Sequence, residues 1–175
     1  MKLLKYFITV IFLLYFSILV LPQDDESQKP CSSPEASQFD FWIGKWKVEW
    51  QNPDSTIAEG TNNVKSILGS CVIEENFSGK PGVDFTGKSF SVYNPVKNIW
   101  QQTWVDDQGG YMVFTGGMEN DKMILSRKVS RDDKEIIQRM VFYNITKDKF
   151  DWNWESSVDN GVTWKLNWKI HYTRL

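Results

Sequence analysis

The sequence contains a single histidine, His171, and only two cysteines, Cys31 and Cys71, among its 175 residues. This scarcity disfavours a zinc site, an axial haem ligand and a histidine-based catalytic triad. The sequence also lacks a glycine-rich phosphate loop, an HExxH motif and an EF-hand loop. We therefore predict no metal and no cofactor, and the motifs do not favour an enzyme.

Basic charge is also scarce, and no basic stripe is present. The formal net charge is -2, and without Lys2 and Lys5 of the N-terminal segment it falls to -4, from 18 basic and 22 acidic residues. A mildly acidic chain has no electrostatic footprint for the phosphates of a nucleic acid. We expect no nucleic-acid partner.

Only one long hydrophobic run is present, and it lies at the N-terminus. Lys2 and Lys5 precede the 16 apolar-rich residues 6–21, a run that is short for a membrane span and typical of a secretory signal. We predict a signal peptide over residues 1–22, a polar linker over 23–38 and one domain over 39–175. The protein is expected in the periplasm or outside the cell. Because no clean cleavage site precedes Pro22, an uncleaved signal anchor is the alternative, and it is the only membrane contact expected.

The two cysteines fit this exported location. An even number of cysteines in an oxidising compartment indicates a disulfide, here between Cys31 in the linker and Cys71 at the third expected strand. Two free thiols, one buried and one exposed, are the alternative.

Aromatic residues are abundant, with nine tryptophans and eleven phenylalanines. Large flat side chains favour pleated strands, and the stretch Phe39–Trp50 opens the domain with five of them. Short alternating segments separated by turn residues continue to the C-terminus, and no long amphipathic helix pattern appears. We predict an all-β, antiparallel up-and-down β-barrel, because closure removes exposed strand edges; a sandwich is the structural alternative. About ten strands are expected, over residues 43–51, 57–68, 71–78, 86–94, 99–105, 111–115, 122–129, 135–145, 150–157 and 163–173.

The last expected strand has the strictest alternation. Apolar side chains occupy every second position from Trp164 to Tyr172, and polar side chains fill the positions between them. A period of two places one face in the core and the other in water. His171 is therefore expected on the solvent face.

A turn motif precedes this strand. Residues 157–164 match the Asp-box pattern S-x-D-x-G-x-T-W, in which Asp159 caps its own turn, Gly161 takes a positive φ and Trp164 anchors the hairpin. A propeller would repeat such a motif at blade spacing, and one copy is present. We interpret the motif as structural.

The two ends of the domain form a second structural pattern. Gly44 and Trp46 in the first strand, with Arg174 near the end of the last, resemble the lipocalin and wider calycin signature. In that signature a basic side chain covers the tryptophan at the closed end of the barrel. The resemblance predicts that Arg174 stacks on Trp46.

Further segments extend this resemblance from Phe39 to the C-terminus: 39–46, 69–75, 87–89 with Tyr93, 100–106, 157–164 and 172–174. Together they resemble a calycin-like family of small secreted bacterial proteins of unknown function. The resemblance implies a lipocalin-like barrel and bacterial export, and it implies no activity. Ser91 departs from the asparagine expected there, which puts one interior polar contact in question.

Polar residues on two aromatic faces are the candidate site. If those faces point inward, they place Glu75 and Gln102 inside the barrel, where a buried carboxylate needs a partner or water. The functional reading is a cavity that binds a small apolar or amphipathic molecule. The alternative is an internal polar network that only stabilises the barrel. The candidate residues are Glu75, Trp100, Gln102, Trp104, Asp106 and Arg139.

Three function classes follow. The first is non-covalent binding of a small, partly apolar ligand in the barrel. The second is a structural or interaction protein of the cell envelope with a filled barrel. The third is a hydrolase or isomerase that uses Glu75 as its acid or base.

Overall fold

A computed structural model of the chain describes residues 30–132 and 134–175. The expected signal segment and most of the linker lie outside these residues. The described part holds two short 3-10 helices and ten strands. They are η1 (Pro34–Ser37), η2 (Asp40–Trp42), β1 (Gly44–Gln51), β2 (Ile57–Ile67), β3 (Val72–Ser78), β4 (Thr86–Asn94), β5 (Ile99–Asp106), β6 (Tyr111–Glu119), β7 (Lys122–Arg131), β8 (Lys134–Tyr143), β9 (Lys149–Ser157) and β10 (Lys165–Arg174).

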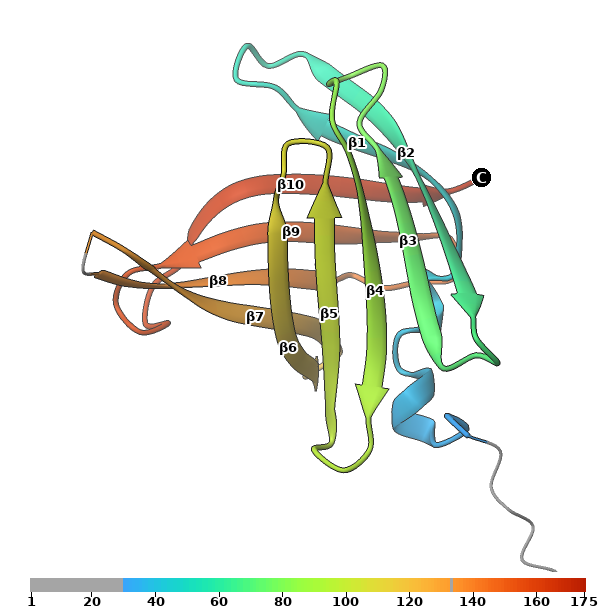
Figure 1. Cartoon of the computed structure of the whole chain (residues 1–175). Helices are drawn as coiled ribbons and strands as arrows, with labels where there is room; N and C mark the ends of the chain where they lie inside the picture. Colours follow the sequence, from blue (N-terminus) through green and yellow to red (C-terminus); the bar gives the residue numbers. More distant parts are fainter. Residues whose placement is uncertain (1–29, 133) are drawn as a thin grey trace, which may run out of the picture.

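The ten strands form one closed antiparallel barrel. Each strand pairs with its sequence neighbours, and β1 pairs with β10 to complete the ring. In Figure 1, β4, β5 and β6 run side by side across the front while β8, β9 and β10 cross behind them. The predicted up-and-down barrel is confirmed, and the sandwich alternative is wrong because the first and last strands are hydrogen-bonded.

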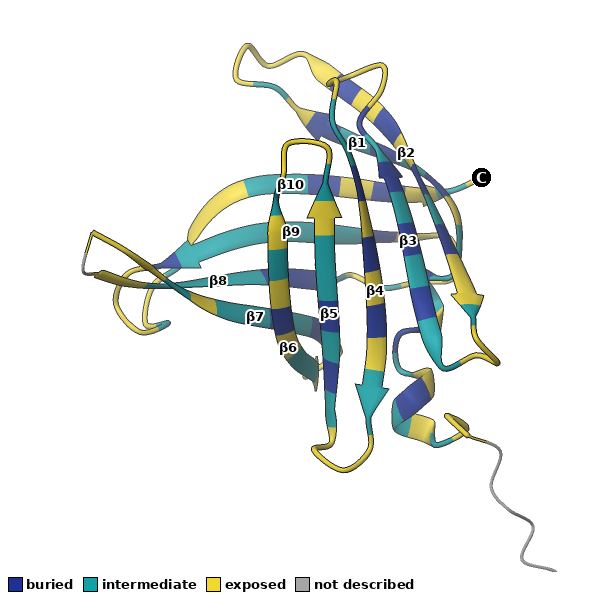
Figure 2. Cartoon of the chain, in the orientation of Figure 1, coloured by how far each residue is buried: buried dark blue, intermediate teal, exposed yellow. Residues whose placement is uncertain are grey.

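Alternation along the strands decides which side chains enter the barrel. Buried and more exposed residues alternate along β3 and β4 (Figure 2), as the period of two predicts. Along β3, for example, Ile73, Glu75 and Phe77 are buried, and their neighbours are less so. The sequence pattern therefore determines the inner face of these strands.

The strand boundaries lie within two residues of the predicted ones, except at the end of β6. We expected one strand to end at Thr115, but β6 continues through Gly116 and Gly117 to Glu119. A Cβ atom on Gly116 would lie 1.9 Å from the carbonyl oxygen of Ile124, so this glycine permits close approach of β7 and does not end the strand. In contrast, β8 ends at Tyr143, before the predicted Ile145, because Asn144 adopts a positive φ of 53°.

The strict alternation predicted for the last strand is wrong at its start. The pairing of β10 with β9 shifts between Leu166 and Trp168, so Leu166 faces Glu155 and Trp168 faces Trp154. A bulge adds one residue to one strand and reverses which face the following residues occupy. Leu166 is consequently exposed, whereas Trp168 packs against the core.

One end of the barrel is filled by the segment that opens the domain. Phe39 and Trp42, both fully buried, stack at a ring-centroid distance of 4.9 Å. The indole N–H of Trp46 donates a hydrogen bond to the carbonyl oxygen of Trp42 at 2.7 Å. Arg174 lies over Trp46, with its guanidinium carbon 4.1 Å from the ring centroid. The Arg174–Trp46 stacking expected from the resemblance is therefore present, and this region is called the closed end below.

Gly44 is required at the closed end. Its φ is +147°, and a Cβ atom there would lie 2.1 Å from Nη1 of Arg174. A side chain at this position would therefore displace the arginine from Trp46.

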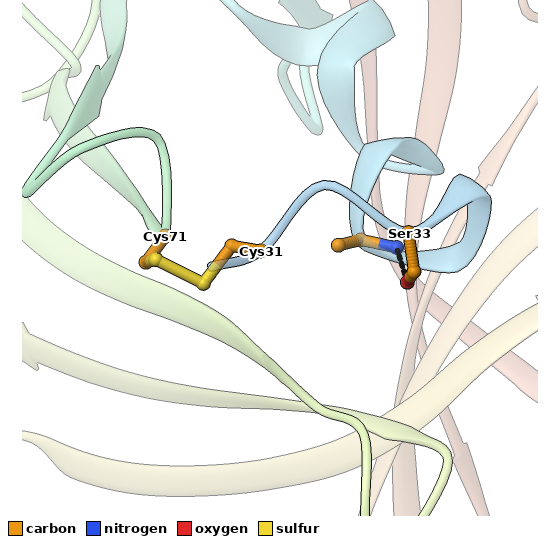
Figure 3. The surroundings of a disulfide bond; sticks show 4 residues. Cys31, Ser33 and Cys71 are labelled. Atoms are coloured by element: carbon orange, nitrogen blue, oxygen red, sulfur yellow. Dashed lines mark hydrogen bonds between the residues drawn. A yellow bond between two sulfur atoms is a disulfide. The ribbon is translucent and has the colours of Figure 1, made fainter. Parts of the chain in front are cut away.

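The predicted disulfide is confirmed. Cys31 and Cys71 are bonded, with their Cα atoms 5.1 Å apart (Figure 3). Beside the bridge, the Ser33 hydroxyl accepts a hydrogen bond from the backbone N–H of Ala36 and caps η1. The bond ties the segment before the barrel to the turn between β2 and β3. Within the described part of the chain, no helix is long and apolar enough to span a bilayer.

Candidate functional site

The barrel contains a cavity of about 340 Å³ that is partly open to solvent. Its wall is mostly aromatic, from Trp42, Phe77, Phe85, Trp104, Phe114, Phe142, Trp152, Trp154, Trp168 and Tyr172. Met112, Met140 and Ile170 add apolar surface, and three polar side chains face the space: Glu75, Arg127 and Gln138. An aromatic wall with a few polar groups is the usual composition of a site for a small ligand.

Glu75 is held in the barrel wall by two neutral donors. Asn62 donates its amide N–H to Oε1 at 2.7 Å, and Ser89 donates its hydroxyl to Oε2 at 2.6 Å. Burial raises the pKa of Glu75 from 4.5 to about 7, and the hydrogen bonds from Ser89 and Asn62 oppose this shift only in part. The carboxyl group is therefore poised to gain or lose a proton near neutral pH.

Tyr172 extends this network. Its hydroxyl lies 3.3 Å from the Asn62 amide nitrogen. Burial raises the pKa of Tyr172 well above its usual range, and the nearby Glu75 adds to the shift. The phenol stays neutral at any physiological pH.

Arg127 is the cation of the cavity. Its guanidinium carbon lies 5.4 Å from the ring centroid of Phe114 and 6.0 Å from that of Trp154. Its Nε donates a hydrogen bond to Oε1 of Gln138, the facing residue on β8, at 2.8 Å. Burial lowers the pKa of Arg127. Among residues 30–132 and 134–175, no carboxylate lies within ion-pair distance of it.

Comparison with known families identifies the domain. Residues 33–174 match the family described as a protein of unknown function, DUF1579. The chain belongs to this family. The match covers the ten strands of the barrel and both sides of the cavity, so the cavity is part of the family domain. A search of curated proteins finds no match.

The barrel of this DUF1579 domain brings two of the six candidate residues to the cavity. Glu75 and Trp104 line it. Trp100 and Gln102 also point into the barrel but are buried nearer the closed end, outside the cavity wall. Gln102 donates its amide N–H to the Ser91 hydroxyl at 2.9 Å, so Ser91 does supply a polar contact there. The Trp100 indole N–H and Gln102 Oε1 have no hydrogen-bond partner among the described residues.

Asp106 lies at the opposite end of β5, beside the turn to β6. It accepts hydrogen bonds from the Trp104 indole N–H at 3.0 Å and from the backbone N–H of Gly110 at 2.7 Å. It does not line the cavity. Its contacts orient one wall tryptophan and close the turn.

The expectation that Arg139 faces the cavity is wrong. Its neighbours on β8, Gln138 and Met140, point inward, so Arg139 points outward. There it forms an ion pair with Glu155 at 2.7 Å and stacks over the ring of Trp164 at 3.6 Å. Arg139 therefore anchors the Asp-box hairpin on the outer surface.

The Asp-box residues hold that hairpin. Asp159 accepts hydrogen bonds from the hydroxyl and the backbone N–H of Thr163, which lower the pKa of the Asp159 carboxyl. Gly161 adopts a φ of 84°, and its carbonyl oxygen accepts the Trp164 indole N–H at 3.0 Å. The contacts are local, as the structural interpretation predicts.

Arg127 and Gln138 were not among the residues predicted from the sequence. The signal for Arg127 is its parity with Met123 and Leu125, two buried residues on the same face of β7. A cationic residue that shares a strand face with buried apolar residues is expected to point into the barrel.

His171 lies on the outer surface, where its Nδ1 contacts the Asp151 carboxylate. Within the described residues, no group of three or more histidine, cysteine, aspartate and glutamate side chains is arranged to hold a metal ion.

Proposed function

We propose that this chain is an exported, calycin-like barrel that binds a small, partly apolar molecule in its interior cavity. The observation that carries the proposal is the cavity of about 340 Å³, with an aromatic wall and only three polar side chains. Empty apolar space costs stability in a protein core, so a hollow of this size favours a role in binding. It also argues against the alternative of an envelope protein with a filled barrel.

Export is supported by two features. The disulfide between Cys31 and Cys71 suits an oxidising compartment such as the periplasm or the cell exterior. The apolar run over residues 6–21, preceded by two lysines, suits a secretory signal.

The test of binding is native mass spectrometry of protein purified from its own host. We expect an adduct that is retained under native conditions and lost on denaturation. A Met112→Trp variant fills the cavity from β6 and should lose the adduct. The matched control is Val113→Trp, because Val113 is the next residue on β6 and is 48% exposed. An adduct that survives in both variants would place the ligand outside the cavity.

A second candidate function is proton transfer by Glu75. Its pKa of about 7 and its position in the cavity wall suit a general acid or base. Once the co-purifying molecule is identified, the wild type should convert it slowly to a product that mass spectrometry detects. The Glu75→Gln variant should still bind the molecule but should form no product. Equal conversion by the wild type and the variant would reject this candidate.

A further inference from the structure

The side chain of Arg127 is the least satisfied arginine of the described chain. A guanidinium carries five N–H donors, and only Nε of Arg127 is used, by Gln138. By contrast, Arg174 donates to three backbone carbonyl oxygens and Arg139 pairs with Glu155. Arg131, the remaining arginine, is exposed to water beside Asp132. Arg127 thus presents unused donors to an aromatic cavity.

Partial burial weakens the hydration of this guanidinium and so favours an anionic partner in the cavity. A cation removed from water loses solvation, and the faces of two aromatic rings and one neutral amide replace it only partly. The amide nitrogen of Gln138 makes no hydrogen bond within the described chain, so it adds N–H donors beside the guanidinium. The Arg127 guanidinium and the Gln138 amide nitrogen can therefore both donate hydrogen bonds to the two oxygens of one carboxylate.

Glu75 does not fill this role. Its two oxygens are already occupied by Asn62 and Ser89, and no ion pair joins it to Arg127. Glu75 lies in the middle of β3 and Arg127 near the middle of β7, and β4, β5 and β6 separate these two strands along the barrel wall. The cavity wall beside Glu75 consequently disfavours an anionic group, and the wall beside Arg127 favours one.

We infer that the cavity selects compact monoanions, above all carboxylic acids, whose charged group binds Arg127 and Gln138 and whose apolar body packs among the tryptophans. This inference rests on the proposed binding function and specifies its ligand class. A second carboxylate at the far end of the ligand would lie towards Glu75 and weaken binding.

The test uses pairs of probes that differ in charge and little in shape. Naphthalene-2-carboxylate is compared with naphthalene-2-carboxamide, and octanoate is compared with octanamide and with octanedioate. The wall tryptophans report occupancy through their fluorescence, and calorimetry gives the Kd. There are five of them: Trp42, Trp104, Trp152, Trp154 and Trp168. We expect each monocarboxylate to bind about tenfold or more tightly than its amide, as for a hydrogen bond to a charged group. Octanedioate should bind more weakly than octanoate.

Arg127→Met should abolish the preference for the carboxylate while binding of the amide is retained. Arg127→Lys, which keeps the charge but not the planar fork, should retain part of the preference. The control is Lys128→Met, which removes one positive charge from the neighbouring exposed position and should behave as the wild type. Thermal unfolding followed by circular dichroism verifies that each variant is folded.

Three results would overturn the inference, and they differ in what else they reject. If amide and carboxylate bind equally to the wild type, the charge selection is wrong and binding in the cavity still stands. If no probe of either pair binds, the proposed binding function fails as well. A preference that persists in Arg127→Met would also reject Arg127 as the anion-binding group.

Discussion

Two arginines lie over aromatic rings inside the barrel, one at the closed end and one in the cavity, and their surroundings differ. At the closed end, Arg174 covers Trp46 and donates to the carbonyl oxygens of Phe41, Ile43 and Lys147 at 2.7 to 3.2 Å. In the cavity, Arg127 lies over Phe114 and Trp154 and donates one hydrogen bond, to Gln138. The first arginine completes a packed layer, whereas the second borders a cavity.

This difference suggests that the closed end stabilises the barrel, whereas the cavity region serves the proposed function. The closed end buries Phe39, Trp42 and Trp46 with almost no exposed surface, and its polar contacts are internal. The cavity region leaves Arg127 without a counter-charge, which a protein tolerates where a ligand supplies the missing interaction. The same pair of residue types, arginine and tryptophan, thus serves the fold at the closed end and a candidate site in the cavity.

The largest expected effect is from Trp46→Ala at the closed end. The side chain is fully buried and its indole is hydrogen-bonded, so the free energy of unfolding should fall by about 3–5 kcal/mol. Trp104→Ala, in the cavity wall, should lower it by only about 1–2 kcal/mol, because one side of this ring already faces empty space. Urea denaturation of both variants checks this. Equal losses would mean that the two regions are packed equally well.

In the cavity wall, Glu75→Gln should change how stability depends on pH. Burial raises the pKa of Glu75 above its unfolded value of 4.5 to about 7. The wild type therefore keeps its full stability below pH 4.5 and loses part of it as the pH rises through 7. Relative to the variant, the wild type should lose about 3 kcal/mol between pH 4 and pH 8. Parallel pH profiles of the two proteins in urea denaturation would show that Glu75 titrates normally.

Arg174→Met should cost about 1–2 kcal/mol, since it removes the stacking on Trp46 and three hydrogen bonds to carbonyl oxygens. Arg174→Lys should recover only part of this loss, because an ammonium group cannot reach three carbonyls as a planar fork does. The measurement is the urea midpoint. Full recovery by lysine would indicate that charge alone is needed at the closed end.

The smallest effect is expected from Arg127→Met. Removing a partly buried charge that has one neutral partner should change the free energy of unfolding by less than about 0.5 kcal/mol, or raise it slightly. Calorimetric unfolding without added ligand checks this. A loss as large as that of Arg174→Met would make Arg127 a structural residue and remove the contrast between the two arginines.

The local pattern of the sequence predicted much of the fold. The alternation grouped Glu75 with the aromatic face of β3 and Gln102 with Trp104 on one face of β5, and both of these faces point into the barrel. The pairing of Cys31 with Cys71 followed from their number and the expected compartment, and the bond is present. The alternation succeeded because it depends only on residues close together in the sequence. The disulfide succeeded because it depends only on the number of cysteines and the compartment.

Other features depended on contacts that no local pattern carries. The bulge at Asn167 moves Leu166 to the outer face, and the alternation from Trp164 to Tyr172 does not predict this bulge. Arg139 was expected inside and Arg127 was not, because a strand pattern shows which residues share a face without showing which face is inner.

By itself, the sequence determined the number of strands, the antiparallel order set by short turns and the tryptophan that starts the barrel. Those features follow from side-chain periodicity and turn chemistry, which act over a few residues. Only the tertiary structure decided that the barrel closes through β1 and β10, that its interior is solid around Trp46, and that it is hollow beside Arg127. Closure and packing depend on how all ten strands fit together in space, and the volume left between their side chains is a property of that fit.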